Sequence, residues 1–312
     1  MLDEFAVWRS CTNGCFGNSV KRGRFQFINW KKLIVMNSDK RISTHYRHGN
    51  LLAAIQAGLE KQGIDRENVS VEDLGPVDEF HIGGRAASIH FLEQLKISPS
   101  QTILDIGCGL GGSARFAAKT YGAKIAGIDL TSEYIEVGQQ LCDWVGLSNS
   151  INLQQGSALS LPFEDASFDS AFMMHVGMNI ENKHALFSEV SRVLKSGAKF
   201  GIYDIMKDND EELIYPVPWA TTSETSWVAE PKDYRMALEA NGFIVAEENN
   251  RHDFAMDFFK KMKAASGAAG GPPPLGLHVL MQQTTAEKIP NMIANLAARR
   301  ISPIEMIAIK DA

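Results

Sequence analysis

Four glycines that follow a short apolar segment are the residues best suited to hold a nucleotide-like ligand. Residues 102–106 form a β-branched, apolar run, which predicts a buried strand. Directly after it, before a helical pattern, come Gly107, Gly109, Gly111 and Gly112. A strand, a glycine turn and a helix place a nucleotide against backbone and a helix N-terminus, where a Cβ would block close approach. Because the spacing fits both G-x-G-x-x-G and G-x-G-x-G, it leaves the cofactor open.

An acidic residue stands at the end of the next predicted strand. Asp129 follows the apolar run 124–128 and lies about 20 residues beyond Gly109, where a carboxylate accepts hydrogen bonds from ribose hydroxyls. The structural alternative is that Asp129 caps the following helix. Its position at a strand end and its separation from the glycines favour the ribose role.

Polar residues also follow the later strands. Ser157 and Ala158 come after the strand predicted over 151–155, where they could flank an adenine. His175 comes directly after the strand predicted over 168–174. The carboxyl ends of parallel strands meet at one edge of a sheet. The residues expected to converge there are Gly107, Asp129, Ser157, His175 and Asp204.

The elements that position these residues predict an α/β fold. Strands alternate with helical patterns, which requires a mostly parallel sheet with helices on both faces. A last strand is expected to return beside the sixth. The predicted strands are residues 102–106, 124–128, 151–155, 168–174, 199–204, 243–247 and 301–309.

The chain divides into one main domain and several additions. Residues 37–96 read as an N-terminal helical lid, and residues 97–312 as the main domain, with cap segments at 205–230 and 250–302. The second cap segment is expected to be a helical insertion before the last strand. Residues 1–36 show no sustained period and are expected to lie outside the core, with Met36 as the natural start. Their Cys11 and Cys15 are too few to bind a metal, so no metal site is expected.

Composition limits the partners. Lys and Arg number 31 and Asp and Glu 37, a net charge of −6, which disfavours nucleic acid and anionic membranes. No apolar run approaches the ~18 residues of a membrane-spanning helix. Four cysteines in 312 residues are typical of a reduced, cytoplasmic protein. These features predict a small-molecule substrate and leave the oligomeric state open.

Several ordered motifs resemble the S-adenosylmethionine-dependent methyltransferases with a Rossmann-like fold. The resemblance covers roughly residues 97–250, and Asp105 before the first glycine is typical of these enzymes and unusual in dehydrogenases. The matching residues are Ile103 to Gly111, Gly127 to Leu130, Leu161 to Phe163, Ser167 to Asp169 and Ser191 to Gly197.

The resemblance implies S-adenosyl-L-methionine as cofactor. The family usually has an acidic residue where this chain has Ser157, which leaves the adenine amino group to a weaker partner. The cofactor-binding residues that it implies are Asp105, Gly107, Cys108, Gly109, Gly111, Asp129, Leu130, Ser157, Ala158 and His175.

Within that family, two segments resemble the small-molecule branch of sarcosine and dimethylglycine N-methyltransferases. These segments are Phe80–Gly84 and Pro216–Trp219. The first expectation is therefore N-methylation of a small amine, and the alternative is C-methylation of a quinone or phenol-like ring. A wide apolar pocket would favour the ring, and an arginine such as Arg47 or Arg85 facing the methyl group would favour an amino acid. A nicotinamide dehydrogenase and a non-catalytic cofactor-binding protein are the remaining alternatives.

Three residues are candidates for the chemistry of the acceptor. An amine only has to arrive unprotonated, whereas an oxygen or carbon acid needs a general base. His175 is the first candidate, with His81 and Tyr46 behind it; His175 could equally contact the cofactor, and His81 could be a structural histidine. The residues expected to contact the substrate are Arg85, Asn179 and Trp219.

Overall fold

A computed structural model describes residues 39–269, 273–281 and 284–311 of the chain. They form a seven-stranded sheet with the order β3-β2-β1-β4-β5-β7-β6. Neighbouring strands among β1 to β5 are parallel, whereas β7 is antiparallel to both β5 and β6. The expected mostly parallel sheet, with the last strand beside the sixth, is confirmed. The strands are β1 (Thr102–Ile106), β2 (Lys124–Asp129), β3 (Ile151–Gln155), β4 (Phe168–Met174), β5 (Leu194–Lys207), β6 (Phe243–Asn250) and β7 (Ile301–Lys310).

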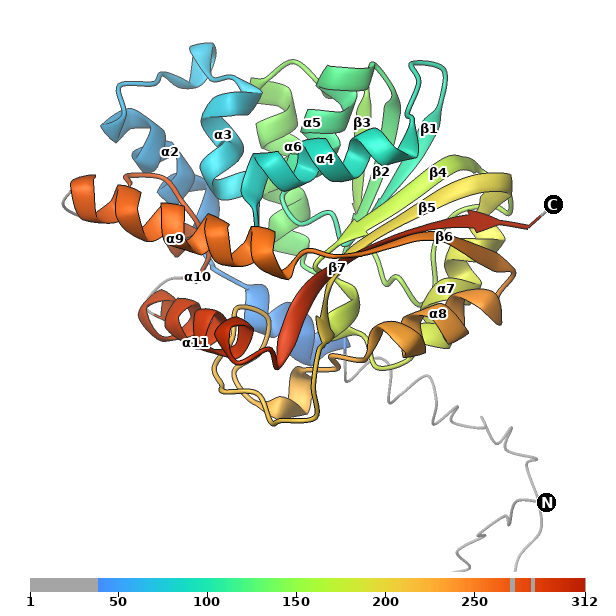
Figure 1. The fold of residues 1–312 in the computed structure, drawn as a ribbon. Coiled ribbons are helices and arrows are strands. Elements are labelled where there is room, and N and C mark those ends of the chain that lie inside the picture. Colours follow the sequence, from blue (N-terminus) through green and yellow to red (C-terminus); the bar gives the residue numbers. More distant parts are fainter. Residues whose placement is uncertain (1–38, 270–272, 282–283, 312) are drawn as a thin grey trace, which may run out of the picture.

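Helices cover both faces of the sheet (Figure 1). On one face, α4 (Gly84–Leu95), α5 (Gly112–Tyr121) and α6 (Ser132–Trp144) pack residues such as Phe91 onto the strands. On the other face, α7 (Lys183–Val193) and α8 (Pro231–Glu239) bury Phe187 and Tyr234. The strands are therefore apolar on both sides, as a central parallel sheet requires.

The N-terminal part adds a smaller apolar cluster. A helix over residues 39–46, here called the 39–46 helix, precedes α2 (Leu51–Lys61) and α3 (Val71–Asp78). Leu51, Leu59 and Leu74 pack with residues of α6. The carboxylate of Glu133 on α6 accepts hydrogen bonds from the backbone N–H groups of His48, Gly49 and Leu51. This contact fastens the start of α2 to the main domain.

The segment between β6 and β7 builds a further apolar layer. It contains α9 (His252–Ala269), α10 (His278–Met281) and α11 (Thr285–Ala297). Figure 1 shows α9 and α11 near one another at one end of the sheet, and their side chains pack with Trp219 from the loop after β5. Short 3₁₀ turns complete the described elements: η1 (Arg66–Asn68), η2 (Gly177–Asn179) and η3 (Ser223–Thr225).

Some expected boundaries were wrong. β5 begins at Leu194, five residues before the expected start at residue 199. β5 also continues to Lys207, because β7 pairs with it as far as that residue. α3 was not expected; it contains Pro76, which costs a backbone hydrogen bond, and its residues Leu74 and Val77 pack into the N-terminal apolar cluster. The expectations for residues 1–36, including Cys11 and Cys15, lie outside the described residues.

Candidate active site

The carboxyl ends of four strands surround one cavity, here called the donor cavity. Gly107 and Gly109 follow β1, Asp129 ends β2, Ser157 follows β3 and His175 follows β4, and all of them line it. The structure thus brings together four of the five strand ends that were expected to converge.

Asp204 is the exception, and its expected place at this edge was wrong. β5 continues past it, so Asp204 is fully buried inside the strand. Its carboxylate accepts a hydrogen bond from the hydroxyl of Tyr234 at 2.7 Å. It therefore connects the sheet to α8 and does not line the donor cavity.

The glycines of the turn have different structural roles. A Cβ on Gly109 would meet only Tyr134, at 4.0 Å, so the space in front of this residue is open to a ligand. A Cβ on Gly111 would lie 2.8 Å from Leu153, and one on Gly112 would lie 2.7 Å from the carbonyl oxygen of Asp78. Gly111 and Gly112 therefore permit helix packing, and Gly111 is not among the residues that line the cavity.

Two carboxylates lie beside this turn. Asp129 accepts hydrogen bonds from the backbone N–H groups of Gly109 at 3.0 Å and Thr131 at 2.8 Å. Asp105 is buried, and one of its carboxylate oxygens has no partner among the described residues. Burial, together with the charge of Asp129, raises the pKa of Asp105 well above its ordinary value. A cation in the cavity would give this oxygen its missing partner.

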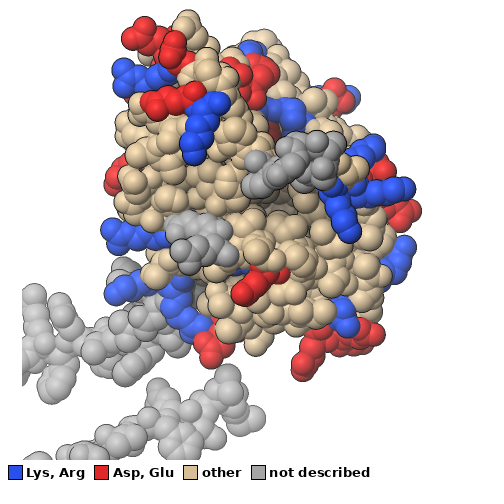
Figure 2. Space-filling model, turned by 90° about the vertical axis from the view of Figure 1, so that its left-hand side faces the viewer, with Lys and Arg blue, Asp and Glu red and all other residues tan. Residues whose placement is uncertain are grey.

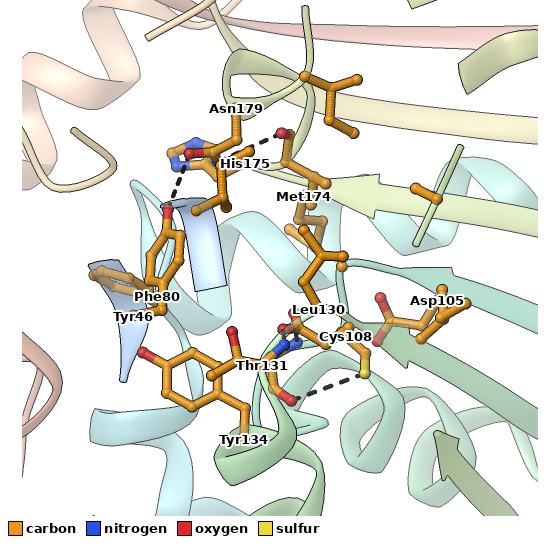
Figure 3. Close-up of a pocket in the computed structure, with 18 of the residues that line it drawn as sticks. Tyr46, Phe80, Asp105, Cys108, Leu130, Thr131, Tyr134, Met174, His175 and Asn179 are labelled. Atoms are coloured by element: carbon orange, nitrogen blue, oxygen red, sulfur yellow. Dashed lines mark hydrogen bonds between the residues drawn. The ribbon is translucent and has the colours of Figure 1, made fainter. Parts of the chain in front are cut away.

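Aliphatic and sulfur-bearing side chains complete this part of the cavity. Leu130 and Ala158 line it beside the strand ends, and Cys108 lines it from the turn (Figure 3). Burial raises the pKa of the Cys108 thiol well above its ordinary value, so the thiol is un-ionised. These side chains supply apolar contact to a ligand and no charge.

His175 projects from the end of β4 with an uncommon backbone conformation. Its φ is +57°, and its backbone N–H donates to the carbonyl of Tyr203 at 2.7 Å. The ring nitrogen Nε2 is buried and has no hydrogen-bond partner among the described residues. Burial is the main cause that lowers the pKa of His175 well below its ordinary value, and the nearby His81 is the second cause. The imidazole is therefore neutral and has an unused polar nitrogen.

His81 is held more tightly. Its Nε2 lies 3.2 Å from a carboxylate oxygen of Glu79, 3.0 Å from the hydroxyl of Ser88 and 3.2 Å from the carbonyl of Gly84. The same nitrogen therefore fixes the connection between α3 and α4. This arrangement favours the structural interpretation of His81 over its role as a base.

Tyr46 and Asn179 meet in the lining of the donor cavity. The Tyr46 hydroxyl donates to the side-chain oxygen of Asn179 at 3.3 Å, and Figure 3 shows the two side chains pointing toward one another. Burial raises the pKa of Tyr46, which keeps the phenol protonated. The pair links the 39–46 helix to the η2 turn that follows β4.

A second cavity, here called the apolar cavity, adjoins the first. Tyr46, Phe80, His81 and His175 line both of them. The remaining lining comes from the turn between α3 and α4, the η2 turn, the loop after β5 and the segment between β6 and β7. It consists of Ile82, Met178, Pro218, Trp219, Phe258, Phe259, Met262, Leu277, Ile289 and Met292.

No Asp, Glu, Lys or Arg lines the apolar cavity within the described part of the chain. The indole N–H of Trp219 donates to the hydroxyl of Ser226 at 2.9 Å, so it is already satisfied. Figure 2 looks at the molecule from this side, and charged side chains are sparse in the middle of that face and denser around its margin. A ligand in this cavity would therefore meet mainly carbon and sulfur atoms.

Arg85 lies outside both cavities. Its Nε is 2.8 Å from a carboxylate oxygen of Glu79, and its guanidinium lies 4.5 Å from the ring centre of Phe116. These contacts direct it between helices, away from a bound substrate. Of the three residues expected to contact substrate, Asn179 lines the donor cavity and Trp219 lines the apolar cavity.

Sequence reasoning missed most of the apolar cavity. Phe258 and Met262 are four residues apart, and Ile289 and Met292 are three apart, a helical spacing that is equally typical of core residues. It also missed Asp39 and Tyr134 in the donor cavity. Nothing local in the sequence indicates that the 39–46 helix returns to the sheet edge.

Comparison with known proteins identifies the family. Residues 104–202 match the family model described as a methyltransferase domain. The O-methyltransferase resE of Aspergillus sclerotiorum is 30% identical, over 66% of this chain and 76% of that protein. The chain belongs to the S-adenosylmethionine-dependent methyltransferases.

Other relatives match this methyltransferase over a shorter part of the chain or at lower sequence identity. The sterol 4-C-methyltransferase strm-1 of Caenorhabditis elegans is 36% identical over 39% of this chain, which spans only 36% of that protein. The structure of the geranyl diphosphate C-methyltransferase of Streptomyces coelicolor A3(2) superposes with a TM-score of 0.63 at 15% identity, covering 88% of this chain and 98% of that one. The superposition confirms the Rossmann-like fold.

In residues 39–269, 273–281 and 284–311, no group of His, Cys, Asp and Glu residues is arranged to hold a metal ion. No helix in the same residues has both the length and the hydropathy to span a bilayer.

Proposed function

We propose that this protein transfers a methyl group from S-adenosyl-L-methionine to an uncharged, apolar small molecule. One observation supports the acceptor class above all others. The apolar cavity adjoins the donor cavity, shares four lining residues with it, and has no charged side chain among its described lining residues. Burying an unpaired charge in an apolar cavity costs free energy. An uncharged ring would bury its surface there without that cost.

The donor cavity suits S-adenosylmethionine. That cofactor supplies a methyl group on a sulfonium cation and carries an amino-acid tail and an adenosine. The unpartnered oxygen of Asp105 would meet the tail ammonium, Gly109 leaves room for close contact, and Asp129 would accept from the ribose hydroxyls. The position of Gly112 in the sequence made a dinucleotide cofactor an alternative. In the structure, Gly112 packs against α3.

An amino-acid acceptor was the first expectation, and the geometry supports it less well. Sarcosine and dimethylglycine carry a carboxylate that needs a cation or several donors in a buried site. Of the two candidate cations, Arg85 is paired with Glu79, and neither Arg85 nor Arg47 is among the described lining residues of either cavity. A sterol 4-C-methyltransferase among the relatives also supports an apolar acceptor. C-methylation of a quinone or phenol-like ring, the original alternative, therefore becomes the preferred proposal.

The residues of this chain would mainly orient the two reactants. Holding a nucleophile in line with the methyl group contributes roughly 7–11 kcal/mol to the barrier reduction. His175 stands where the two cavities meet, and its neutral Nε2 would accept the proton of an acceptor hydroxyl as a ring carbon takes the methyl group from the sulfonium. That ring carbon would then release its own proton, and the hydroxyl would re-form. Phe80 and Tyr46 would exclude water from the same junction.

A labelled-methyl screen over quinols, phenols and small amines tests the proposal. We expect transfer to apolar rings and none to sarcosine or dimethylglycine, together with calorimetric binding of S-adenosylhomocysteine. Met292→Lys would place a charge in the apolar cavity and should lower kcat/KM by more than about tenfold, with S-adenosylhomocysteine affinity unchanged. Met236→Lys, at a methionine that is 66% exposed, is the matched control.

Other results would overturn the proposal. Transfer to sarcosine in preference to every ring compound would restore the amine as acceptor. Binding of NAD without any response to S-adenosylmethionine or S-adenosylhomocysteine would contradict the methyltransferase activity itself.

A further inference from the structure

The donor cavity receives one carboxylate from outside the sheet. Asp39 on the 39–46 helix lines it together with Ser157, which follows β3. We propose that Asp39 recognises the amino group of the donor's adenine, and this assignment rests on the proposed function. The carboxylate would thus come from the N-terminal helix, and Ser157 would only orient it.

The order of the strands places the adenine. β1 neighbours β2, and β2 neighbours β3 at the edge of the sheet. With the ribose hydroxyls on Asp129 at the end of β2, the base must extend toward the end of β3 or back over β1. The region over β1 holds the glycine turn and Asp105, which leaves the end of β3 for the base.

The walls at this end suit a flat aromatic ring. Apolar side chains would contact its faces, and the polar groups would meet its edge. The apolar lining residues here are Ile42, Leu130, Ala158 and Leu159. Ile42 belongs to the same helix as Asp39, so one helix would contribute both a face and an edge contact.

Two polar side chains compete for the adenine edge. Ser157 offers a neutral hydroxyl, which lies close enough to Asp39 to oppose the rise in the pKa of that carboxyl that burial causes. Asp39 offers a half-buried carboxylate, which accepts a hydrogen bond from an amino group more strongly than a hydroxyl does. The Asp39 carboxylate is therefore the better acceptor for the exocyclic N–H.

The other carboxylates of the cavity are committed or placed elsewhere. Asp78 pairs with Arg115, and Asp129 holds the glycine turn and its neighbour Thr131. Asp105 lies at the opposite end, beside that turn. Glu181, which follows the η2 turn, also lines the cavity and is exposed. Glu181 is therefore the natural comparison for Asp39.

Two ligands that differ only at this edge test the assignment. S-inosylhomocysteine has an oxygen where S-adenosylhomocysteine has the amino group. The wild-type protein should prefer the adenosyl ligand in calorimetry by about 10- to 100-fold, as expected for a hydrogen bond to a charged group. Asp39→Asn should reduce that preference to within about threefold, because an amide can donate to the oxygen as readily as accept from the amine.

Matched variants identify the responsible residue. Glu181→Gln and Ser157→Ala should keep most of the preference, and an unchanged melting temperature would show that each variant is folded. A full preference in Asp39→Asn would overturn the assignment while leaving the proposed function intact. Collapse of the preference in Ser157→Ala alone would give the role to Ser157. If the wild-type protein bound neither ligand, the proposed function would fail.

Discussion

The unused nitrogen of His175 is the most informative single atom of the site. A buried polar atom without a partner is costly, and such atoms often await a ligand. The low pKa of His175 means that the basic form persists well below neutral pH. Protonation of this residue should therefore cause no loss of activity as the pH falls from about 8 to about 6.

Replacement of His175 separates its two candidate roles. Asn tolerates a positive φ, so His175→Asn should fold. If His175 is the base, kcat should fall by about 10²–10⁴-fold, with S-adenosylhomocysteine affinity within about threefold of the wild type. Steady-state kinetics with calorimetry measure both quantities, and the exposed His184→Asn is the control. Weaker donor binding at an unchanged kcat would instead make His175 a cofactor contact.

At the residue scale, the sequence predicted the positions of those site residues that depend on local spacing alone. Gly109 and Asp129 were expected at the ends of two neighbouring strands from their spacing in the sequence, and both line the donor cavity there. Arg85 and Asp39 depend on how separate helices pack. The direction of Arg85 is decided by Glu79 and Phe116, and Asp39 reaches the cavity only because the 39–46 helix folds back over it.

Among the elements, the 39–46 helix connects the most parts of the site. Arg41 forms an ion pair with Glu224 at 3.1 Å, and a ring nitrogen of His45 lies 3.1 Å from the carbonyl of Pro218. Tyr46 lines both cavities. The helix is followed by the three backbone N–H groups that bind Glu133. Burial opposes ionisation of Glu133, but these hydrogen bonds outweigh it and lower its pKa.

Glu133→Gln tests this attachment. The amide keeps one accepting oxygen and loses the other, which removes part of a helix cap worth ~1 kcal/mol. Hydrogen exchange in residues 39–61 should accelerate, and the Kd for S-adenosylhomocysteine should rise about threefold to tenfold. Glu136→Gln, on the exposed side of the same helix, is the control. Unchanged exchange in 39–61 would show that packing alone holds the segment.

At the element scale, periodicity predicted the alternation of strands and helices and the return of the last strand. It could not give the length of β5, because that length is set by pairing with a strand a hundred residues later in the chain. It also could not distinguish the cavity-lining side chains of α9 and α11 from ordinary core. Both kinds of residue are apolar and recur every three to four positions.

Across the whole molecule, buried charge makes stability depend on pH. Burial raises the pKa of Asp204 to about 6, although Tyr234 and Lys183 oppose this rise. Between about pH 4 and pH 6 the folded protein therefore keeps a proton that the unfolded chain releases. Stability should fall as the pH rises through this range.

Comparison with Asp204→Asn isolates that effect. The free energy of unfolding of the wild type, relative to the variant, should fall by about 2 kcal/mol between about pH 4.5 and about pH 7. Urea unfolding at the two pH values measures the difference. Asp210→Asn, at a side chain that is 97% exposed, should show no such change. An equal difference at both pH values would indicate that Asp204 is ionised throughout.

The position of β7 also has a consequence for how the molecule is made. β7 lies between β5 and β6, yet it follows every other strand in the sequence. During synthesis, β5 therefore has an unpaired edge, and β6 has no neighbouring strand, until residues 301–310 leave the ribosome. Open strand edges invite pairing with other chains. Nascent protein arrested before residue 301 should consequently aggregate or recruit chaperones, even though every strand end that forms the donor cavity has already been made.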